Sequence, residues 1–328
     1  MMNSPVETIF YIIDETATIL QEELSCTYLE AVAETGENLF QDDILQDEVS
    51  EVTKKRLQKS YEEANIGEQP NETIRKAFQF AILKGMKESV QPNHQMTPDS
   101  LGLFISFLVN KFITTEKELS VLDPAIGTGN LLTTVLNQMA NSNVHSIGVE
   151  IDEVLIKLAY VGANLQKHRL ELFNQDSLEP LFIDPVDLVL SDLPIGYYPN
   201  DVRAQDYELQ AKEGHSFAHH LFIEQSIKHT KAGGYLFFIV PNGLFESTQS
   251  QQLHEYLHKE VHIQGLLQLP TSLFKNEKAG KSILILQKKK EEIKPPKEIL
   301  LATLPSLMKQ SAVEDILAKI DGWIKQNK

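Results

Sequence analysis

The sequence predicts an α/β protein in which a seven-stranded, doubly wound, Rossmann-like sheet follows an all-helical N-terminal domain. Two observations lead to this fold class. Apolar positions between residues 5 and 90 recur at intervals of three and four, which is typical of amphipathic helices. Farther along the chain, short apolar runs alternate with helical segments, which is typical of a parallel sheet with helices on both faces.

The helical pattern places an N-terminal domain at residues 1–93. The segment NIGEQPNET, residues 65–73, interrupts the pattern, and Asn71 within it predicts the start of a new helix. The stretch QPNHQMTPDS, residues 91–100, has the composition of a linker into the second unit.

The second unit, residues 94–289, contains the predicted sheet. Each strand is a short apolar run that is bounded by turn residues. The seven expected strands are LSVLDPA, VHSIGVEI, LELFNQD, VDLVLSDL, GGYLFFIVP, IQGLLQLP and SILILQ. Residues 290–328 are predicted to form a linker and a C-terminal helix within SAVEDILAKIDGWIKQ.

Composition and charge restrict the possible functions. The net charge is −16, and residues 1–95 hold 18 acidic against 8 basic side chains. Proteins that bind nucleic acid alone usually need Lys and Arg, so the balance argues against tight autonomous DNA binding. The single cysteine, Cys26, excludes an internal disulfide and a cysteine-based zinc site. Without a signal peptide or a long apolar stretch, we expect a cytoplasmic protein that does not contact a membrane.

Ligands of parallel sheets bind beyond the carboxyl ends of the strands, and the first strand ends in DPAIGTGN. Gly127 and Gly129 allow a tight turn there and a close approach of the backbone to a ligand. A dinucleotide fingerprint would need a third glycine where Leu132 stands. Asp123 is a poor neighbour for a pyrophosphate and a good one for a cation. A positively charged ligand is therefore favoured over a dinucleotide.

Acidic residues also follow the next two strands. Glu150 lies 23 residues after Gly127, a spacing at which a carboxylate can accept hydrogen bonds from two ribose hydroxyls. Asp176 could accept from an adenine amine beside the backbone N–H of Ser177. An acid after a strand is also a common helix N-cap, and Asp152 and Asp176 keep that alternative. Together, the three strand ends predict a site for a nucleoside cofactor.

The segments TPDSLG, DPAIGTGN, GVEID, NQDS and SDLPI resemble, in this order, the motifs of class I S-adenosylmethionine-dependent methyltransferases, and specifically of adenine-specific DNA methyltransferases. The later segments GGYLFFIVPNGLF and GLLQLPTSLF are similar to the modification subunits of type I restriction systems. The chain is similar also to the small stand-alone group labelled YtxK. The resemblance spans about residues 94–289 and implies a methyltransferase sheet with S-adenosylmethionine as its cofactor.

The resemblance assigns cofactor contacts residue by residue. Thr97 and Pro98 would lie against the methionine part, the glycine turn would surround it, and Glu150 and Asp176 would hold the ribose and the adenine. The full set of expected cofactor-binding residues is Thr97, Pro98, Asp123, Pro124, Ala125, Gly127, Thr128, Gly129, Asn130, Glu150, Ile151, Asp152, Asp176, Ser177, Asp192 and Pro194.

The resemblance also implies the catalytic residues Asp192, Leu193, Pro194 and Ile195, where the family has Asn or Asp, Pro, Pro and an aromatic residue. The exocyclic amine of adenine is a weak nucleophile. The Asp192 carboxylate and the Leu193 carbonyl would accept its hydrogens and direct its lone pair at the methyl group, while Pro194 fixes the turn.

Two residues depart from the family pattern. Leu193 replaces the first proline, and Ile195 replaces the aromatic that stacks on a flipped-out base. Stacking contributes about 1–3 kcal/mol per base, so its loss would weaken activity strongly. Tyr197 or Tyr198 is expected to take over the stacking. The equal alternative is that both tyrosines pack against the body of their own loop.

These patterns leave three functions open. The first is methyl transfer to the exocyclic amine of adenine in DNA, with a specificity or partner subunit that supplies DNA contacts. The second is methyl transfer to RNA, a protein amide or a small molecule. The third is a catalytically inactive, cofactor-binding interaction protein. No metal is expected, and the histidines of HSFAHH are interpreted as part of a helix start rather than as ligands.

Overall fold

The structure is a computed structural model that describes residues 4–88, 96–113, 118–139, 143–274, 276, 279–306 and 310–327. The predicted domain boundary at residues 93 and 94 lies outside the described residues, and so does the first half of the predicted linker. The second half of that linker is partly helical, because α5 begins at Asp99.

Within residues 4–88, four α-helices form the N-terminal domain, and side-chain caps define where the first three begin. Ser4 and Thr27 each accept a hydrogen bond from the backbone three residues later, with a glutamate that closes a capping box. Asn71 starts the fourth helix, as predicted, after the short turn η1 (Ile66–Glu68). The helices are α1 (Pro5–Leu24), α2 (Tyr28–Gln41), α3 (Glu51–Ala64) and α4 (Asn71–Glu88).

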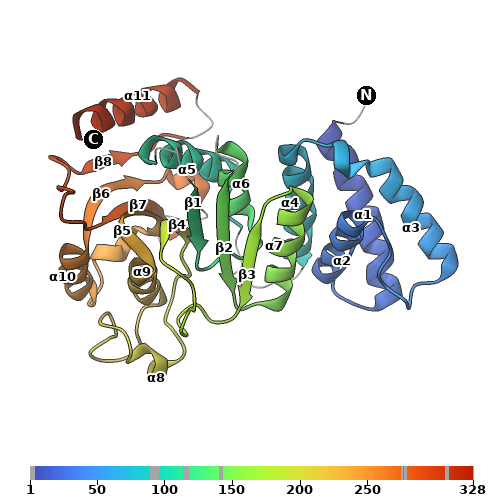
Figure 1. The fold of residues 1–328 in the computed structure, drawn as a ribbon, viewed down its shortest axis with the longest axis horizontal. Coiled ribbons are helices and arrows are strands. Elements are labelled where there is room, and N and C mark those ends of the chain that lie inside the picture. Colours follow the sequence, from blue (N-terminus) through green and yellow to red (C-terminus); the bar gives the residue numbers. More distant parts are fainter. Residues whose placement is uncertain are drawn as a thin grey trace.

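The helical domain packs on the rest of the protein mainly through α7 (Glu153–Leu165). Its apolar core, which includes Ile13, Leu57 and Phe78, continues into Leu158 and Val161 of α7. Figure 1 shows α2 and α4 next to α7, with α3 farthest from it. One buried apolar surface therefore holds the two parts together.

Among the described residues, the sheet has eight strands in the order β3-β2-β1-β4-β5-β7-β6-β8, one more than predicted. All neighbouring pairs are parallel except those of β7, which runs opposite to β5 and β6. The additional strand is β8, which lies within the predicted linker and pairs with β6. The strands are β1 (Leu119–Asp123), β2 (Val144–Glu150), β3 (Leu170–Asn174), β4 (Val186–Asp192), β5 (Thr230–Pro241), β6 (Val261–Gln268), β7 (Lys281–Lys288) and β8 (Leu300–Thr303).

Helices cover both faces of the sheet, which confirms the doubly wound α/β class. One apolar core lies between the sheet and α5, α6 and α11, and the second lies between the opposite face and α9 and α10. The remaining elements are α5 (Asp99–Phe112), α6 (Asn130–Gln138), α8 (Asp201–Ala204), α9 (Ala218–Lys228), η2 (Asn242–Phe245), α10 (Ser250–Glu260), η3 (Thr271–Leu273) and α11 (Gln310–Asn327).

The strand order brings four predicted site segments to one edge. Strands β3, β2, β1 and β4 are consecutive neighbours and run in the same direction, so their carboxyl ends lie side by side. Asp176, Glu150, Asp123 and Asp192 lie at or just beyond those ends. Within the described part of the chain, none of the helices has the length and apolarity of a membrane span.

Candidate functional site

The glycine turn joins β1 to α6 in a conformation that favours glycine. Gly127 and Gly129 have φ values of 55° and 77°. A Cβ at position 129 would lie 3.2 Å from the Cβ of Ala159 on α7. Behind the turn, the Ile126 amide donates to the Val149 carbonyl. The two helices can therefore pack closely, and the turn is anchored to β2.

Asp123 lies at the end of β1 beneath this turn and is only 2% exposed. Its Oδ1 accepts hydrogen bonds from the Ala125 amide, at 3.1 Å, and from the Ser191 hydroxyl, at 2.7 Å. Burial raises the pKa of Asp123 to about 7, against those two hydrogen bonds and with the help of the negative charges of Glu150 and Asp192. A cation beside Asp123 would favour its ionised form.

Glu150, at the end of β2, folds over the glycine turn. Its Oε2 accepts from the Gly127 amide at 2.9 Å, and its Oε1 accepts from the amides of Ile151 and Asp152. The side chain of Ile151 is 67% exposed beside it. An acidic group and an open apolar surface thus lie together at this strand end.

Asp152 caps a helix. Its Oδ1 accepts from the amides of Val154 and Leu155 in the first turn of α7. This is the N-cap alternative that the sequence left open for this residue.

Asp176, just beyond β3, is held by its own loop and by a residue from the catalytic segment. Its Oδ1 accepts from the Leu178 amide at 2.9 Å, and its Oδ2 accepts from the Tyr198 hydroxyl at 2.6 Å. The neighbouring Ser177 hydroxyl donates to the Pro124 carbonyl of the glycine turn. These bonds connect the third strand end to both the first and the fourth.

Tyr198 is 5% exposed and belongs to the apolar core under α9. Burial raises the pKa of its hydroxyl, with a further contribution from Asp176. The expectation that Tyr198 could stack on a substrate base is therefore wrong. Its ring is packed inside the protein, and its hydroxyl is bonded to Asp176.

Tyr197 has the opposite environment. It is 63% exposed, forms an isolated β-bridge with Phe217, and stacks on that ring at a centroid distance of 5.0 Å and an interplanar angle of 14°. Pro194 and Ile195 before it are also exposed. The tip of this loop therefore presents one isoleucine and one tyrosine ring to the outside.

Asp192, at the end of β4, has two partners. Its Oδ1 accepts from the Lys281 ammonium at 2.6 Å, and its Oδ2 accepts from the Thr97 hydroxyl at 3.1 Å. The Lys281 contact was missed in the sequence, where one of several lysines in front of the last predicted strand looks like any surface residue. The carboxylate is thus fixed from two sides before any substrate binds.

The Leu193 carbonyl is left without a partner from the sheet. The Leu193 side chain is buried, and its amide donates to Ile239 of β5. In the parallel register, the next donor to the Leu193 carbonyl would be the amide of residue 241. That residue is Pro241, which has no N–H. The carbonyl therefore remains an acceptor next to Asp192.

Thr97, Asn130 and Arg75 extend the polar contacts away from Asp192. The Asn130 side chain donates to the Thr97 carbonyl at 3.2 Å and accepts from the Arg75 guanidinium at 2.9 Å. Thr128 lies near the same arginine, in a small cavity between α4 and α6. Arg75, on α4, was also missed in the sequence.

The histidines of HSFAHH do not gather around a common point. His215 is exposed and contacts the Asp201 carboxylate, while His219 and His220 are buried in α9. Burial lowers the pKa of His219 to about 4 and that of His220 to about 3. Across the described residues, no three His, Cys, Asp or Glu side chains are grouped as metal ligands.

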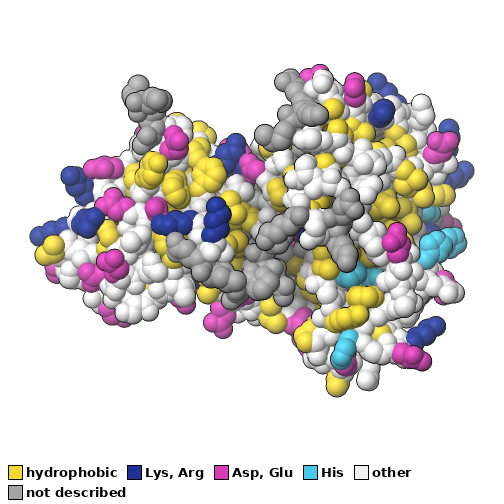
Figure 2. Space-filling view, turned by 180° about the vertical axis from the view of Figure 1, so that it is seen from behind, with side chains coloured by type: hydrophobic (Ala, Val, Ile, Leu, Met, Phe, Trp, Pro, Cys, Tyr) yellow, Lys and Arg dark blue, Asp and Glu magenta, His cyan; other side chains and the backbone are white. Residues whose placement is uncertain are grey.

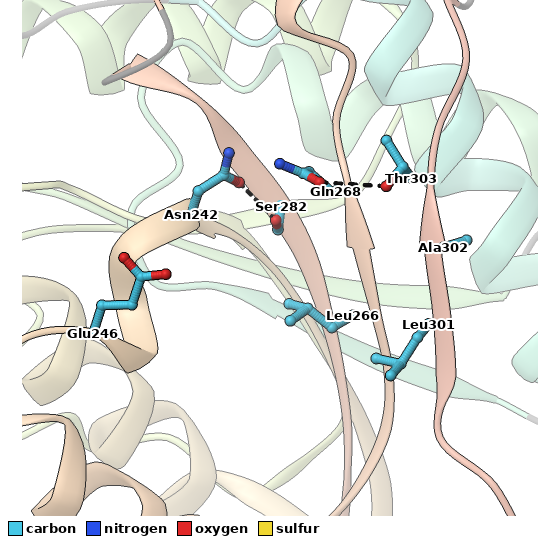
Figure 3. Close-up of a pocket in the computed structure, with 8 residues that line it drawn as sticks. All are labelled: Asn242, Glu246, Leu266, Gln268, Ser282, Leu301, Ala302 and Thr303. Carbon is cyan, nitrogen blue, oxygen red and sulfur yellow. Dashed lines mark hydrogen bonds between the residues drawn. The ribbon is translucent and has the colours of Figure 1, made fainter.

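A groove of about 530 Å³ continues along the same edge of the sheet (Figure 3). Two pairs of polar side chains line it: Ser282 donates to Asn242, and Thr303 donates to Gln268. Glu246 of the turn after η2 is its only charged lining residue among those described, and leucines from β6 and β8 form the apolar part. Ser282 follows Lys281 directly, so the groove begins near the partner of Asp192.

The chain matches two family models. Residues 7–86 match the YtxK N-terminal helical domain, and residues 89–321 match the N-6 DNA methylase family. YtxK of Bacillus subtilis (strain 168), whose function is uncharacterised, is 56% identical over 330 residues, which is the whole of both chains.

Solved structures give the same result. A proposed class I S-adenosylmethionine-dependent methyltransferase from Listeria monocytogenes is 51% identical, with a TM-score of 0.91 over 98% of this chain and 100% of its own. The modification subunit of a proposed type I restriction enzyme from Vibrio vulnificus YJ016 shares the fold. It is 17% identical, with a TM-score of 0.66 over 81% of this chain and 61% of its own. The chain therefore belongs to the N-6 DNA methylase family of methyltransferases and carries a YtxK-type helical domain at its N-terminus.

Proposed function

We propose that this protein is an S-adenosylmethionine-dependent methyltransferase that acts on the exocyclic amine of adenine in DNA. One observation carries the proposal: the Asp192 carboxylate and the Leu193 carbonyl, which has no sheet partner, are adjacent acceptors at the edge where three other carboxylates gather. Membership in the N-6 DNA methylase family supports this assignment.

The residues present fit the cofactor. S-adenosylmethionine carries an ammonium and a sulfonium, a ribose with two hydroxyls, and an adenine; when bound, it supplies the methyl group. Asp123 offers negative charge under the glycine turn, and Glu150 and Asp176 offer oxygens for hydroxyl and amine hydrogens. The exposed Ile151 offers an apolar surface for a flat ring.

The chain's own part in the reaction is to bind and orient the acceptor amine. Two acceptors on one side of an NH₂ group hold its hydrogens and draw its lone pair out of conjugation with the ring. Asp192 is oriented for this by Thr97 and Lys281, and Pro241 leaves the Leu193 carbonyl free of a ladder bond. Such preorganised acceptors need no reorganisation during the reaction.

We propose that the ring of Tyr197 stacks on the acceptor base. Ile195 stands where the family has an aromatic, and the ring of Tyr197 is exposed two residues later. Its stacking on Phe217 gives that ring a fixed orientation. Stacking on a base contributes about 1–3 kcal/mol, so Tyr197→Ala should weaken acceptor binding about tenfold or more.

DNA binding is expected to need a second protein. The net charge is −16. On the face that Figure 2 shows, the Lys and Arg side chains are interspersed with Asp and Glu. The similar protein from Vibrio vulnificus is, by its name, one subunit of a larger enzyme. A partner or specificity subunit would supply phosphate contacts.

The direct test is methyl transfer from radiolabelled S-adenosylmethionine to plasmid DNA, with and without protein partners recovered from cells. We expect adenine-linked label, and a loss of at least about 100-fold in Asp192→Ala because an acceptor aimed at the reacting amine is removed. The matched control is Asp187→Ala, which removes a carboxylate from the opposite end of β4. Absence of label in DNA under both conditions would refute the DNA assignment.

A second acceptor class has its own support. The groove beside Lys281 is lined by amides, hydroxyls and one carboxylate, and no lysine or arginine lines its described part. Such a lining suits a neutral planar group better than a phosphate chain. A protein amide or a small molecule meets this condition, whereas RNA carries the same phosphate chain as DNA. Competition of RNA, protein and small-molecule acceptors against labelled DNA would separate these acceptor classes. Cofactor binding without transfer to any acceptor would instead indicate an interaction protein.

A further inference from the structure

Arg75 belongs to the helical domain, but its contacts extend into the other domain. The side chain is 2% exposed. Its Nε and Nη2 donate to both oxygens of Glu72, one turn earlier on α4, at 2.8 and 2.9 Å. Its Nη1 lies 2.9 Å from Oδ1 of Asn130 and 2.6 Å from Oδ1 of Asp99. One guanidinium thus links α4 to the first residues of α5 and α6.

These two helix starts border the proposed cofactor site. Asp99 follows Thr97 and Pro98, and Asn130 follows Gly129 directly. Asn130 also donates to the Thr97 carbonyl, and Thr97 donates to Asp192. A continuous set of hydrogen bonds therefore runs from the helical domain to the catalytic carboxylate.

The electrostatics favour a fixed guanidinium at this point. Burial opposes the charge, but the hydrogen bonds and charges of Glu72 and Asp99 outweigh it and raise the pKa of Arg75. A planar guanidinium can bind one carboxylate with two donors and still donate elsewhere, whereas an ammonium acts as a point charge. Arginine therefore suits a position with three partners on three helices.

The contacts of Arg75 are not needed simply to hold the two domains together. The apolar core that joins α1, α2 and α4 to α7 already holds the domains together. A separate ion pair across the same boundary links Lys157 of α7 to Glu34 and Glu37 of α2. Lys157 does not contact the two helix starts, and it provides a comparison for Arg75.

We propose that Arg75 is a positioning residue for the cofactor site, through which the helical domain holds the Thr97–Asp99 segment and the Gly129–Asn130 segment in place. This proposal depends on one part of the proposed function, namely that these segments bind S-adenosylmethionine. It gives the N-terminal domain a part in cofactor binding that is independent of the methyl acceptor.

The test is titration calorimetry of S-adenosylmethionine with the full chain, together with thermal unfolding. Arg75→Met should raise the Kd about tenfold or more, since it leaves two carboxylates and an amide without their shared donor. Arg75→Lys keeps the charge and should bind with an intermediate Kd. Lys157→Met, which breaks the other ion pair between the domains, should lower the melting temperature while the Kd stays within about twofold of the wild type.

The outcomes separate the possibilities. The proposal would be overturned if Arg75→Lys and Arg75→Met both folded and bound S-adenosylmethionine with the wild-type Kd. It would also be overturned if Lys157→Met raised the Kd as much as the Arg75 variants, because contacts that only hold the domains together would then explain the effect. Failure of the wild type to bind S-adenosylmethionine would overturn both proposals. Cofactor binding with the expected order of Kd values would support the role of Arg75 even if DNA were never methylated.

Discussion

Because the pKa of Asp123 is raised to about 7, we predict that the affinity for the cofactor depends on pH near neutrality. Its carboxyl is buried beneath the glycine turn, and its pKa is raised to about 7, chiefly by burial and further by the neighbouring carboxylates. The Ala125 amide and the Ser191 hydroxyl both donate to Oδ1, so Oδ2 is the oxygen that would hold a ligand's positive charge. Such a ligand should bind the ionised form.

The size of the effect follows from the ionised fraction. The apparent Kd is the intrinsic Kd divided by the fraction of molecules that can bind. With a pKa of about 7, about one molecule in eleven is ionised at pH 6 and about nine in ten at pH 8. Affinity for S-adenosylmethionine should therefore fall about tenfold from pH 8 to pH 6, or about 1.4 kcal/mol.

The same raised pKa makes stability depend on pH. Because the folded pKa of about 7 lies above the ordinary value of 3.8, the contribution of Asp123 to stability is complete below pH 3.8 and is lost as pH rises through 7. About three pKa units correspond to about 4 kcal/mol. Asp123→Asn keeps an oxygen for the Ala125 and Ser191 donors, so it should raise the free energy of unfolding at pH 8 by up to that amount.

The assay is calorimetric titration of S-adenosylmethionine at pH 6, 7 and 8, with urea unfolding at the same pH values. Asp123→Asn should bind more weakly, with a Kd that no longer changes with pH, and should unfold at a higher urea concentration at pH 8. Asp187→Asn, at the far end of β4, is the control and should keep the wild-type pH profile. A wild-type Kd that is constant from pH 6 to pH 8 would refute the reasoning.

Three further predictions concern single contacts. Gly129→Ala places a Cβ 3.2 Å from α7 at a φ of 77°, and urea unfolding should show a loss of about 1–3 kcal/mol; unchanged stability would contradict the close packing. Tyr198→Phe removes the hydrogen bond to Asp176 and should cost about 1 kcal/mol in the same assay, whereas a neutral result would mean that this bond does not form. Lys281→Met should raise the KM for the acceptor severalfold at unchanged cofactor Kd, because Asp192 loses one of the two donors that orient it, and an unchanged KM would show that Thr97 alone is sufficient to orient the carboxylate.

The carboxyl-edge site could be predicted because its signals are local and its topology is regular. Strands β1, β2 and β4 are apolar runs that end in an acid, Asp176 follows β3 by two residues, and parallel neighbouring strands place their carboxyl ends together. The order β3-β2-β1-β4 therefore gathered Asp176, Glu150, Asp123 and Asp192 without any knowledge of tertiary contacts. The start of α4 at Asn71 was predictable for a similar reason, since a proline and a turn precede it.

Other features depend on contacts that the sequence does not display. Strand β8 has four residues next to a charged linker, and Leu301 within it is 70% exposed, so its apolar pattern is too short to be recognised. Arg75 lies 24 residues from Asp99 and 55 from Asn130, and a basic residue on an amphipathic helix normally faces water. Only the packing of α4 on α6 shows that this position is buried.

The different environments of Tyr197 and Tyr198 could have been predicted from the alternation of side chains along an extended segment. Consecutive side chains of an extended segment point to opposite sides, so Tyr197 and Tyr198 could not both stack on a base or both pack on the loop. The bridge to Phe217 makes this segment extended, and the two rings separate as the rule requires. Tyr197 faces outward beside the catalytic segment, and Tyr198 turns inward and binds Asp176. The loop that would receive the acceptor is therefore bonded directly to a proposed cofactor residue, so displacement of one should disturb the other.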